Sequence, residues 1–429
     1  MSTMPRVHRR VFLKVGTAGL VGLNLADVLR AEARAADGRR AKATGVILVW
    51  LGGGPATIDM WDLKPDAPEE IRGEFKPIDT KASGVRICEH LPRVAEVMDR
   101  CALVRSLNHS ITAHGPGAEY MATGHPPSAA LQYPSLGALA AKLMPAEGGV
   151  PPYVALNGSA GFPGRAGFLG AAYGPFAVST GDRGSPKVEG VALPDGFTPE
   201  QLTDRDQLRG AFDTRFRSLD EADLPAGLDR FQQQAVDILR SDRVRMAFDV
   251  SKEKDAVREA YGRSPFGQST LTARRLVEAG ARFVTVGLNG WDTHGGNFRT
   301  LRQQLLPELD RVLGALVGDL RDRGLLDTTL VYGAGEFGRT PRVNGNAGRD
   351  HWPRSMAVFL AGGGVKGGTV YGRTDAHGIA PDADPCSPAD VSATVMHLLG
   401  IEPGREVRTA TGRPLPVFRD GKVLDPLVG

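Results

Sequence analysis

Three short blocks rich in acids, histidines and glycines lie in the last third of the chain, and their side chains are of the kinds that bind metal ions. The blocks are Trp291-Asp292-Thr293-His294-Gly295-Gly296, Gly335-Glu336-Phe337-Gly338-Arg339-Thr340-Pro341 and Gly348-Arg349-Asp350-His351-Trp352-Pro353. The first two each follow a short apolar run that is typical of a buried strand, and the third precedes one. Carboxylates and imidazoles beyond strand ends are how an α/β sheet builds a site. The pattern favours a metal-dependent hydrolase.

Apolar, strand-like runs alternate with helix-like segments along the chain. Gly45–Leu51 is a continuous apolar run, as expected for a central parallel strand covered on both faces. Further strands are expected at Cys101–Val104, Tyr153–Leu156, Arg282–Val286, Thr329–Tyr332 and Met356–Ala361. Helices are expected at Leu91–Arg100, Tyr133–Met144, Gln232–Val250, Thr270–Ala279, Arg299–Arg323 and Ala389–Leu399. The repeated βα order predicts an α/β fold with a doubly wound, mostly parallel sheet.

The N-terminal segment has the pattern of an export signal. Arg9-Arg10 is followed by a Gly/Ala-rich apolar stretch and then by Ala33-Arg34-Ala35, a small-x-small cleavage site. We expect a Tat signal over residues 1–36 and a periplasmic or extracellular domain over 37–429; a short amphipathic helix that stays attached is the alternative. The segment holds six Lys/Arg and two acids, so the formal +3 of the whole chain belongs to it. A nucleic-acid partner is therefore not expected, and no other stretch is apolar enough to span a membrane.

Two further features of the chain concern its organisation. Residues near 157–230 are rich in Gly, Pro and charge, and we expect them to form an irregular insertion in an otherwise single domain. The three cysteines are Cys88, Cys101 and Cys386, and so few cannot form a disulfide scaffold. One bridge between Cys88 and Cys101, and buried free thiols, both stay open.

The order of these blocks resembles the alkaline phosphatase/sulfatase superfamily, and most closely a family of unknown function among secreted bacterial proteins. The resemblance covers nearly all of residues 37–429 and includes Val358–Gly368 and Asp390–Ile401, which are similar to a strand with its glycine turn and to a closing helix. It implies an alkaline phosphatase-like fold with helices on both faces of the sheet. It also implies hydrolysis of a phosphate or sulfate ester with a divalent metal, Zn²⁺ being favoured and Mn²⁺ or Ca²⁺ being alternatives. The implied ligand is a small anionic ester or a sulfated or phosphorylated glycan.

The resemblance implies metal ligands at Asp292, His294, Glu336 and His351. Asp292 and His294 fall where the superfamily has an Asp followed closely by a His, and an extended backbone aims both the same way; a pair that caps a turn is the alternative. Glu336 takes the place of an aspartate, as a ligand or a base. Arg339 is expected either to bind phosphate or sulfate bidentately or to form a salt bridge with Glu336.

The N-terminal half departs from the superfamily pattern. Gly52–Pro55 stands at the strand tip where acids are expected, so Asp59 or Asp62 would have to swing back as a ligand, or else cap the next turn. His114 falls where the nucleophile should be, and we expect it to be a ligand or a general base for a metal-activated water. His109 could join it or could donate to a backbone carbonyl. These departures favour a second hypothesis, a non-catalytic sulfatase-like protein that binds an anionic glycan or a cell-surface partner.

Overall fold

The computed structural model describes residues 41–146, 149–156, 164–178, 241–409 and 411–429. The chain separates into two units, residues 1–41 and 42–429, and every described helix and strand belongs to the second. The expected export signal over residues 1–36 lies outside the described residues, as does most of the expected insertion near 157–230. Within the described residues, no helix combines the length and the apolarity needed to cross a membrane.

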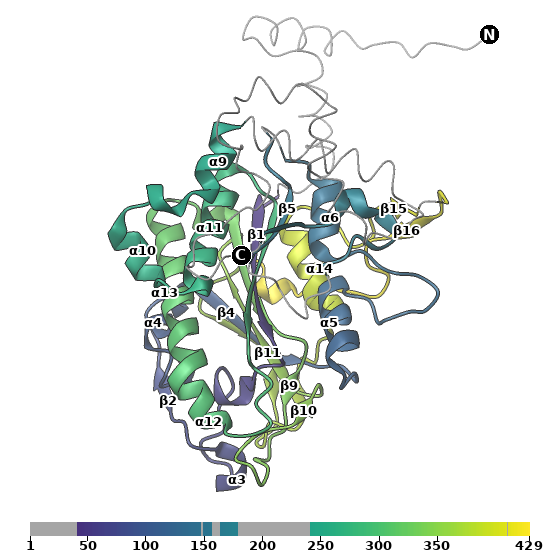
Figure 1. The fold of residues 1–429 in the computed structure, drawn as a ribbon. Coiled ribbons are helices and arrows are strands. Elements are labelled where there is room, and N and C mark those ends of the chain that lie inside the picture. The colour runs from purple at the N-terminus through teal and green to yellow at the C-terminus, as the bar shows by residue number, and fades with distance from the viewer. Residues whose placement is uncertain (1–40, 147–148, 157–163, 179–240, 410) are drawn as a thin grey trace, which may run out of the picture. The chain divides into compact units, whose positions relative to one another are not determined.

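A mixed eight-stranded sheet forms the centre of the second unit, with the strand order β12-β4-β11-β8-β1-β7-β5-β6 (Figure 1). Its strands are β1 (Gly45–Gly52), β4 (Cys101–Leu107), β5 (Tyr153–Leu156), β6 (Phe176–Val178), β7 (Phe283–Asn289), β8 (Thr329–Ala334), β11 (Met356–Ala361) and β12 (Thr369–Tyr371). β1 pairs in parallel with β7 and β8, whereas β11 is antiparallel to both of its neighbours, β4 and β8. All eight residues of β1 are buried, as its unbroken apolar run predicts.

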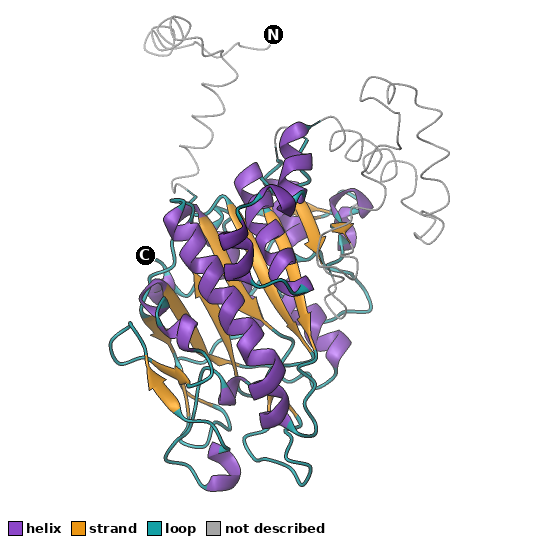
Figure 2. Cartoon of the chain, turned by 60° about the vertical axis from the view of Figure 1, so that its left-hand side comes forward, coloured by secondary structure: helices purple, strands orange, loops and turns teal. Residues whose placement is uncertain are grey.

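Helices cover both faces of this sheet, and Figure 2 shows one helical layer lying across the strands. The helices are α3 (Glu69–Arg72), α4 (Pro92–Ala95), α5 (His114–Thr123), α6 (Leu136–Leu143), α9 (Asp242–Phe248), α10 (Asp255–Tyr261), α11 (Pro265–Ala279), α12 (Asn297–Thr300), α13 (Leu306–Asp322) and α14 (Pro388–Leu398). Because side chains alternate along a strand, Ile47 and Val49 join the core shared with α11 and α13, while Val46 and Leu48 join the core shared with α5, α6 and α14. The predicted doubly wound, mostly parallel sheet is confirmed.

The sequence around α11 shows how the helix boundaries are set. We expected this helix over Thr270–Ala279, but it begins earlier, at Pro265. The side chain of Ser264 accepts a hydrogen bond from the third residue of the helix, and proline suits the first helical position. The helix ends before Gly280, whose φ of 111° is the left-handed conformation expected of that glycine.

Among the residues that the structure describes, four two-stranded antiparallel pairs accompany the main sheet. They are β2 (Pro77–Asp79) with β3 (Arg86–Cys88), β9 (Gly338–Arg339) with β10 (His351–Trp352), β13 (Arg373–Thr374) with β14 (Pro381–Ala383), and β15 (Glu406–Arg408) with β16 (Pro414–Pro416). In the β9–β10 pair, Arg339 lies opposite His351. This pairing brings the second and third blocks of candidate site residues together.

The ends of five strands meet at one edge of the sheet. β1, β7 and β8 are parallel, so their C-terminal ends lie together, with Gly52 of β1 paired to Asn289 of β7. β11 runs the other way and begins at this edge, where Met356 pairs with Leu107 at the end of β4. The loops that follow β1, β4, β7 and β8, and the loop that precedes β11, therefore share this edge. This is why two of the blocks follow strands and the third precedes one.

All three cysteines are buried free thiols. The bridge between Cys88 and Cys101 that the sequence left open is therefore not formed. Burial raises the pKa of Cys88 and of Cys386 to about 12. Their thiolate forms, which would bind a metal, are thus strongly disfavoured at neutral pH.

Candidate metal centre

The loops at this edge of the sheet deliver the predicted site residues. His114 is the first residue of α5, which follows β4. Asp292 and His294 lie just after β7, Glu336 lies just after β8, and His351 opens β10. Side chains that are far apart in the sequence therefore come from neighbouring strand ends, as the sequence predicted.

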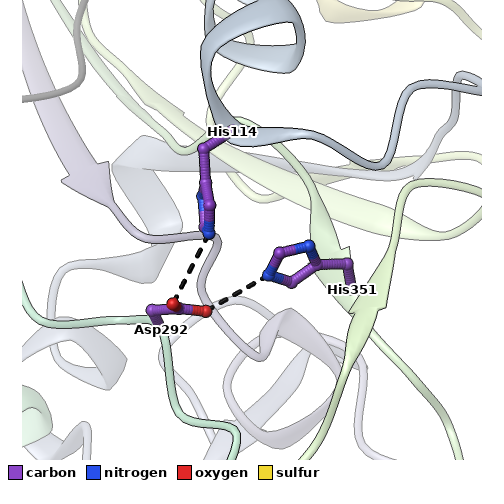
Figure 3. Close-up of side chains that lie close together, drawn as sticks. All are labelled: His114, Asp292 and His351. Carbon is purple, nitrogen blue, oxygen red and sulfur yellow. Dashed lines mark hydrogen bonds and ion pairs between the residues drawn. The ribbon is translucent and has the colours of Figure 1, made fainter.

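His114, Asp292 and His351 form a compact group that could hold a metal ion. One possible ligand atom from each of the three residues lies within 4.8 Å of the others. Figure 3 shows His114 and His351 approaching the Asp292 carboxylate from different elements, with His114 Nε2 3.5 Å from Oδ2 and His351 Nε2 3.2 Å from Oδ1. An aspartate between two imidazoles is a donor set that zinc and related ions use.

His294 joins this group through the same carboxylate. Its Nε2 atom lies 3.1 Å from Asp292 Oδ1 and 3.0 Å from His351 Nε2. Ligand atoms that are each about 2.1 Å from one ion lie roughly 3.0 Å apart in octahedral geometry and roughly 3.4 Å apart in tetrahedral geometry. The spacings among Asp292, His294 and His351 therefore fit a single metal ion. The candidate group thus contains four residues that the sequence singled out.

Each of the three imidazoles is held through Nδ1, so that Nε2 faces the centre. Oxygens of carboxylates and backbone carbonyls accept hydrogen bonds, so each Nδ1 carries a hydrogen, and in the neutral ring each Nε2 keeps a lone pair. The pairs are His114 Nδ1 to Glu336 Oε1 at 2.7 Å, His294 Nδ1 to Asp350 Oδ1 at 2.6 Å and His351 Nδ1 to Thr112 O at 2.8 Å. This is the tautomer in which a histidine binds a metal through Nε2.

Glu336 supports the site from below the surface, being only 3% exposed. Its Oε1 accepts hydrogen bonds from the Gly53 backbone at 2.9 Å and from His114. Its Oε2 is buried and has no hydrogen-bond partner among the described residues. A buried, unpartnered carboxylate oxygen is costly, and a cation or a bound water beside it would remove that cost.

Asp292 is anionic over the whole physiological range. Burial alone would raise the pKa of its carboxyl group, but the hydrogen bond and the positive charge of Arg339 act against burial, and the pKa is lowered. The carboxylate is half-exposed, at 47% of its side chain. It therefore offers a permanent negative charge that is open to solvent, which suits a cation ligand.

Arg339 contacts Asp292 rather than Glu336, the partner that the sequence suggested. Its side chain is fully buried and forms a salt bridge with Asp292 through Nη2. Nε donates to Gly54 O at 2.8 Å, Nη1 donates to Arg349 O at 2.9 Å, and Nη2 also donates to Gly53 O. Most of its donors are therefore used to hold Asp292 and the loop after β1. In this structure the guanidinium does not offer a bidentate face to a phosphate or sulfate.

The tip of β1 carries glycines because no side chain fits there. Gly53 has a φ of +116°, and a Cβ on it would lie 2.5 Å from the Asp292 backbone nitrogen. Gly54 has a φ of +74°, and its Cβ would lie 2.5 Å from the Phe337 ring. An acidic side chain at Gly53 or Gly54 is thus excluded by the approach of the neighbouring loops. The Gly53 backbone N–H faces Glu336 instead.

Asp59 lies in a buried ion pair and does not join the group around Asp292. Arg349 donates to both of its carboxylate oxygens at 2.8 Å, and Asn297 Nδ2 donates to Oδ2 at 2.8 Å. Asp62, the other acid considered, pairs with Lys64 at 3.1 Å. Sequence reasoning did not identify Asn297 or Arg349 as part of the site. Arg349 could have been noticed because it stands in the third block, but nothing in the sequence marks Asn297.

His109 takes the backbone role that was one of its two expected alternatives. Its Nε2 lies 2.9 Å from Glu336 O and donates to it, and its Nδ1 accepts from the Ile111 backbone at 3.1 Å. Burial lowers the pKa of His109, although the bond to Glu336 opposes that effect. Both ring nitrogens are therefore satisfied, and the neutral ring fixes the backbone that carries Glu336.

Comparison with known proteins places the chain among proteins whose function is not known. The model of a family described as "Protein of unknown function (DUF1501)" matches residues 43–428. No curated protein matches the chain. The family match spans every loop that contributes to the candidate metal centre.

Several solved structures share the general fold at low identity. A phosphonate monoester hydrolase from Silicibacter pomeroyi is 12% identical, with 89% of this chain and 76% of that one covered and a TM-score of 0.36. The PsFucS1 sulfatase from Pseudoalteromonas sp. is 13% identical, with 86% and 70% covered and a TM-score of 0.38. An alkaline phosphatase from the Antarctic bacterium TAB5 is 13% identical, with 80% and 96% covered and a TM-score of 0.34. Likenesses this distant do not bear on the activity of this chain.

Proposed function

Because the chain belongs to the family described as protein of unknown function (DUF1501), its activity has to be inferred from its own site, and we propose that it is an exported, metal-dependent hydrolase of phosphate or sulfate esters. One observation carries the metal part of this proposal. Three imidazoles have their Nδ1 atoms occupied by oxygen acceptors, and their Nε2 atoms gather around the carboxylate of Asp292. With its rings neutral, such a set favours a bound cation.

The preference of this set for a cation follows from the contacts between the ligand atoms when the rings are neutral. His294 Nε2 and His351 Nε2 lie 3.0 Å apart, and both would present lone pairs to each other and to the Asp292 carboxylate. Contacts between acceptors repel unless a positive charge lies among them. A set of imidazoles with one carboxylate favours Zn²⁺ over Ca²⁺, which prefers oxygen ligands, and Mn²⁺ stays the main alternative.

The residues divide into those that would hold the ion and those that would move a proton. Asp292, His294 and His351, whose ligand atoms are 3.0–3.2 Å apart, would hold it. When bound, the ion would supply a Lewis acid and offset the negative charge that develops on an anionic ester. His114 is 3.5 Å from the other oxygen of Asp292, at the border of this set.

We assign His114 the role of general base. Its Nε2 lone pair can take a proton from the attacking water, and the Glu336 carboxylate, 2.7 Å from Nδ1, would stabilise the imidazolium that results. Asp350 and the Thr112 carbonyl hold His294 and His351 in the matching tautomer. Arg339 fixes Asp292 without facing the substrate.

The deciding experiment measures metal content and turnover together. Purified protein is expected to contain stoichiometric divalent metal by elemental analysis and to hydrolyse an aryl phosphate or an aryl sulfate. His294→Ala and His351→Ala should lose the metal, whereas His377→Ala, which removes an exposed histidine from the β13–β14 loop, should keep it. Wild-type protein with no metal and no turnover of either ester would refute the proposal.

A second candidate function is a non-catalytic protein that binds an anionic glycan or a cell-surface partner. The observation that favours it is the position of Arg339, whose guanidinium is turned to the backbone and to Asp292 rather than outward. Stoichiometric metal without turnover, together with calorimetric binding of a sulfated or phosphorylated glycan that His351→Ala abolishes, would support this function over the first.

The export part of the proposal rests on the sequence pattern at residues 1–36 alone. Replacing both Arg9 and Arg10 by lysine is expected to block Tat-dependent export. Cell fractionation should then find the uncleaved chain in the cytoplasm, while the wild-type chain, cleaved at the end of the 1–36 segment, is found outside. An unchanged distribution would contradict export by this route.

A further inference from the structure

A buried polar chain links the two loops that carry the proposed metal ligands. Thr293 Oγ1 donates to Asn297 Oδ1 at 2.7 Å, and Asn297 Nδ2 donates to Asp59 Oδ2 at 2.8 Å. Arg349 completes the chain with one 2.8 Å bond to each oxygen of Asp59. None of the four residues is more than 5% exposed. Polar groups buried this deeply hold a fixed geometry because each loses its partner if it moves.

Both ends of this chain are adjacent to ligands in the sequence. Thr293 stands between Asp292 and His294, and Arg349 stands two residues before His351. The two ends also touch directly, because the Arg349 backbone N–H donates to Thr293 O at 3.1 Å. The chain therefore fixes the loop after β7 against the loop before β10.

Every N–H group of the Arg349 guanidinium has a hydrogen-bond acceptor. Nε and Nη2 donate to Asp59, and Nη2 also donates to Ile71 O at 2.9 Å. Nη1 donates to Thr340 O at 3.0 Å and to Pro341 O. All of its N–H groups thus have partners, and a lysine, with three donors and no planar fork, could not replace them. A buried ion pair of this kind contributes more to a defined geometry than to net stability.

We propose that Arg349 and Asp59 are positioning residues that set the spacing of the metal ligands, an inference that rests on the proposed function. The hydrogen bonds of both side chains go to other groups than the proposed ligand atoms, so their effect passes through the backbone of the two loops. A looser loop would widen the 3.0 Å separation between His294 Nε2 and His351 Nε2. Metal affinity would fall even though every ligand is still present.

The test compares Co²⁺ binding in variants of the full chain. Arg349→Lys and Asp59→Asn are expected to raise the dissociation constant for Co²⁺ by about 10- to 100-fold, the usual effect of removing a partner that supports a ligand. The visible absorption of the bound Co²⁺ should change with them, because it reports the arrangement of the ligands. Asn297→Ala, which keeps the ion pair and removes one link, should have a smaller effect in the same direction.

A buried arginine far from the proposed ligands provides the matched control. Arg274 is fully buried and pairs with Glu253, which is 9% exposed, so Arg274→Lys should lower the melting temperature while Co²⁺ affinity stays at the wild-type value. Wild-type affinity and spectrum in folded Arg349→Lys or Asp59→Asn would overturn the inference and leave the proposed function intact. If Arg349→Lys does not fold, the Co²⁺ affinities of Asp59→Asn and Asn297→Ala provide the test. Wild-type protein that binds no Co²⁺ or Zn²⁺ would overturn the proposed function and this inference with it.

Discussion

Glu336 accepts the Nδ1 hydrogen of His114 at 2.7 Å with one carboxylate oxygen, while the other oxygen is buried and unpartnered among the described residues. The two residues are separated by 222 positions in the sequence. The carboxylate fixes the tautomer of His114 and can stabilise its protonated form. When His114 takes up a proton, the positive charge of its ring lies beside the negative charge of Glu336. The pair is therefore suited to accept a proton in the site.

Glu336→Gln tests the charge of this pair, since glutamine keeps the shape and can still accept from His114. We expect kcat/KM to fall by about 10- to 100-fold, because the neutral amide no longer stabilises the imidazolium. The control is Glu402→Gln, which alters another Glu–His pair, with His397 at 3.2 Å and outside the site. Equal kcat/KM in wild type and Glu336→Gln would exclude a proton-transfer role for the pair.

Removal of the metal should destabilise the folded chain. Chelation leaves the Nε2 atoms and the Asp292 carboxylate facing one another without a cation. Free metal at a concentration of 100 times its dissociation constant adds about 2.7 kcal/mol to the free energy of unfolding. We expect a lower melting temperature with EDTA and recovery when Zn²⁺ is added. In His294→Ala the melting curve recorded with EDTA should coincide with the curve recorded with Zn²⁺. A Zn²⁺-induced shift that survives in His294→Ala would show that the ion binds elsewhere.

Gly53→Ala should lower metal affinity as well as stability. The stability loss comes from the positive φ of residue 53, and the loss of metal affinity comes from a steric clash. The new Cβ would lie 2.5 Å from the Asp292 nitrogen, so the loop that carries two ligands must move. The control is Gly280→Ala, which has nearly the same φ, +111° against +116°, but has nothing within 4 Å of its Cβ. Both variants should lose about 1–2 kcal/mol of stability to the left-handed conformation, and only Gly53→Ala should also lose metal affinity. Equal metal affinity in Gly53→Ala and Gly280→Ala would show that the loop after β7 accommodates the new Cβ without moving its ligands.

The stability of the protein should fall in acid partly through Glu253. Burial would raise the pKa of this carboxyl group, but hydrogen bonds from Arg274 and Arg275 and the charges of Arg274 and Arg323 lower it to about 2. Glutamate in an unfolded chain titrates near 4.3. The unfolded state thus binds more protons between these values, and the stabilisation, complete above about pH 4.3, is lost as the pH falls toward 2.

Urea unfolding between pH 6 and pH 2.5 measures this effect. The free energy of unfolding of wild type should decline more steeply over this range than that of Glu253→Gln, which has no proton to bind there. Glu406→Gln, at an exposed position, should follow the wild-type curve. Parallel curves for wild type and Glu253→Gln would mean that the arginine cluster does not lower the pKa of Glu253.

Much of the fold could be predicted because its signals are local. The expected strands Tyr153–Leu156 and Met356–Ala361 are β5 and β11 to the residue. The helix expected over Arg299–Arg323 is divided: α13 begins only at Leu306, with Pro307 in its first turn, after a π-helical segment at Leu301–Leu305. The helix expected over Leu91–Arg100 was wrong as a single element: it consists of α4 and a separate 3₁₀ turn at Met98–Arg100.

The site was predictable in its residue types and not in its pairings. Alternation along an extended backbone pointed Asp292 and His294 the same way, and both meet His351. The partners of Asp59 and Arg339 could not be predicted, because they depend on how closely the loop after β1 approaches the loops after β7 and β8. That approach is set by the glycines at 53 and 54, whose conformation becomes evident only in three dimensions.

The central position of β1 has a consequence for the order of events in folding. This strand is near the start of the chain, and its two sheet neighbours, β7 and β8, are made only after residues 283 and 329. Contacts over such separations close large loops and form slowly. A growing chain that has not yet reached His351 therefore holds at most part of the ligand set. The proposed ion can therefore meet its full ligand set only after β1, β7 and β8 have been made, so that set is not available to guide the earliest steps of folding during synthesis.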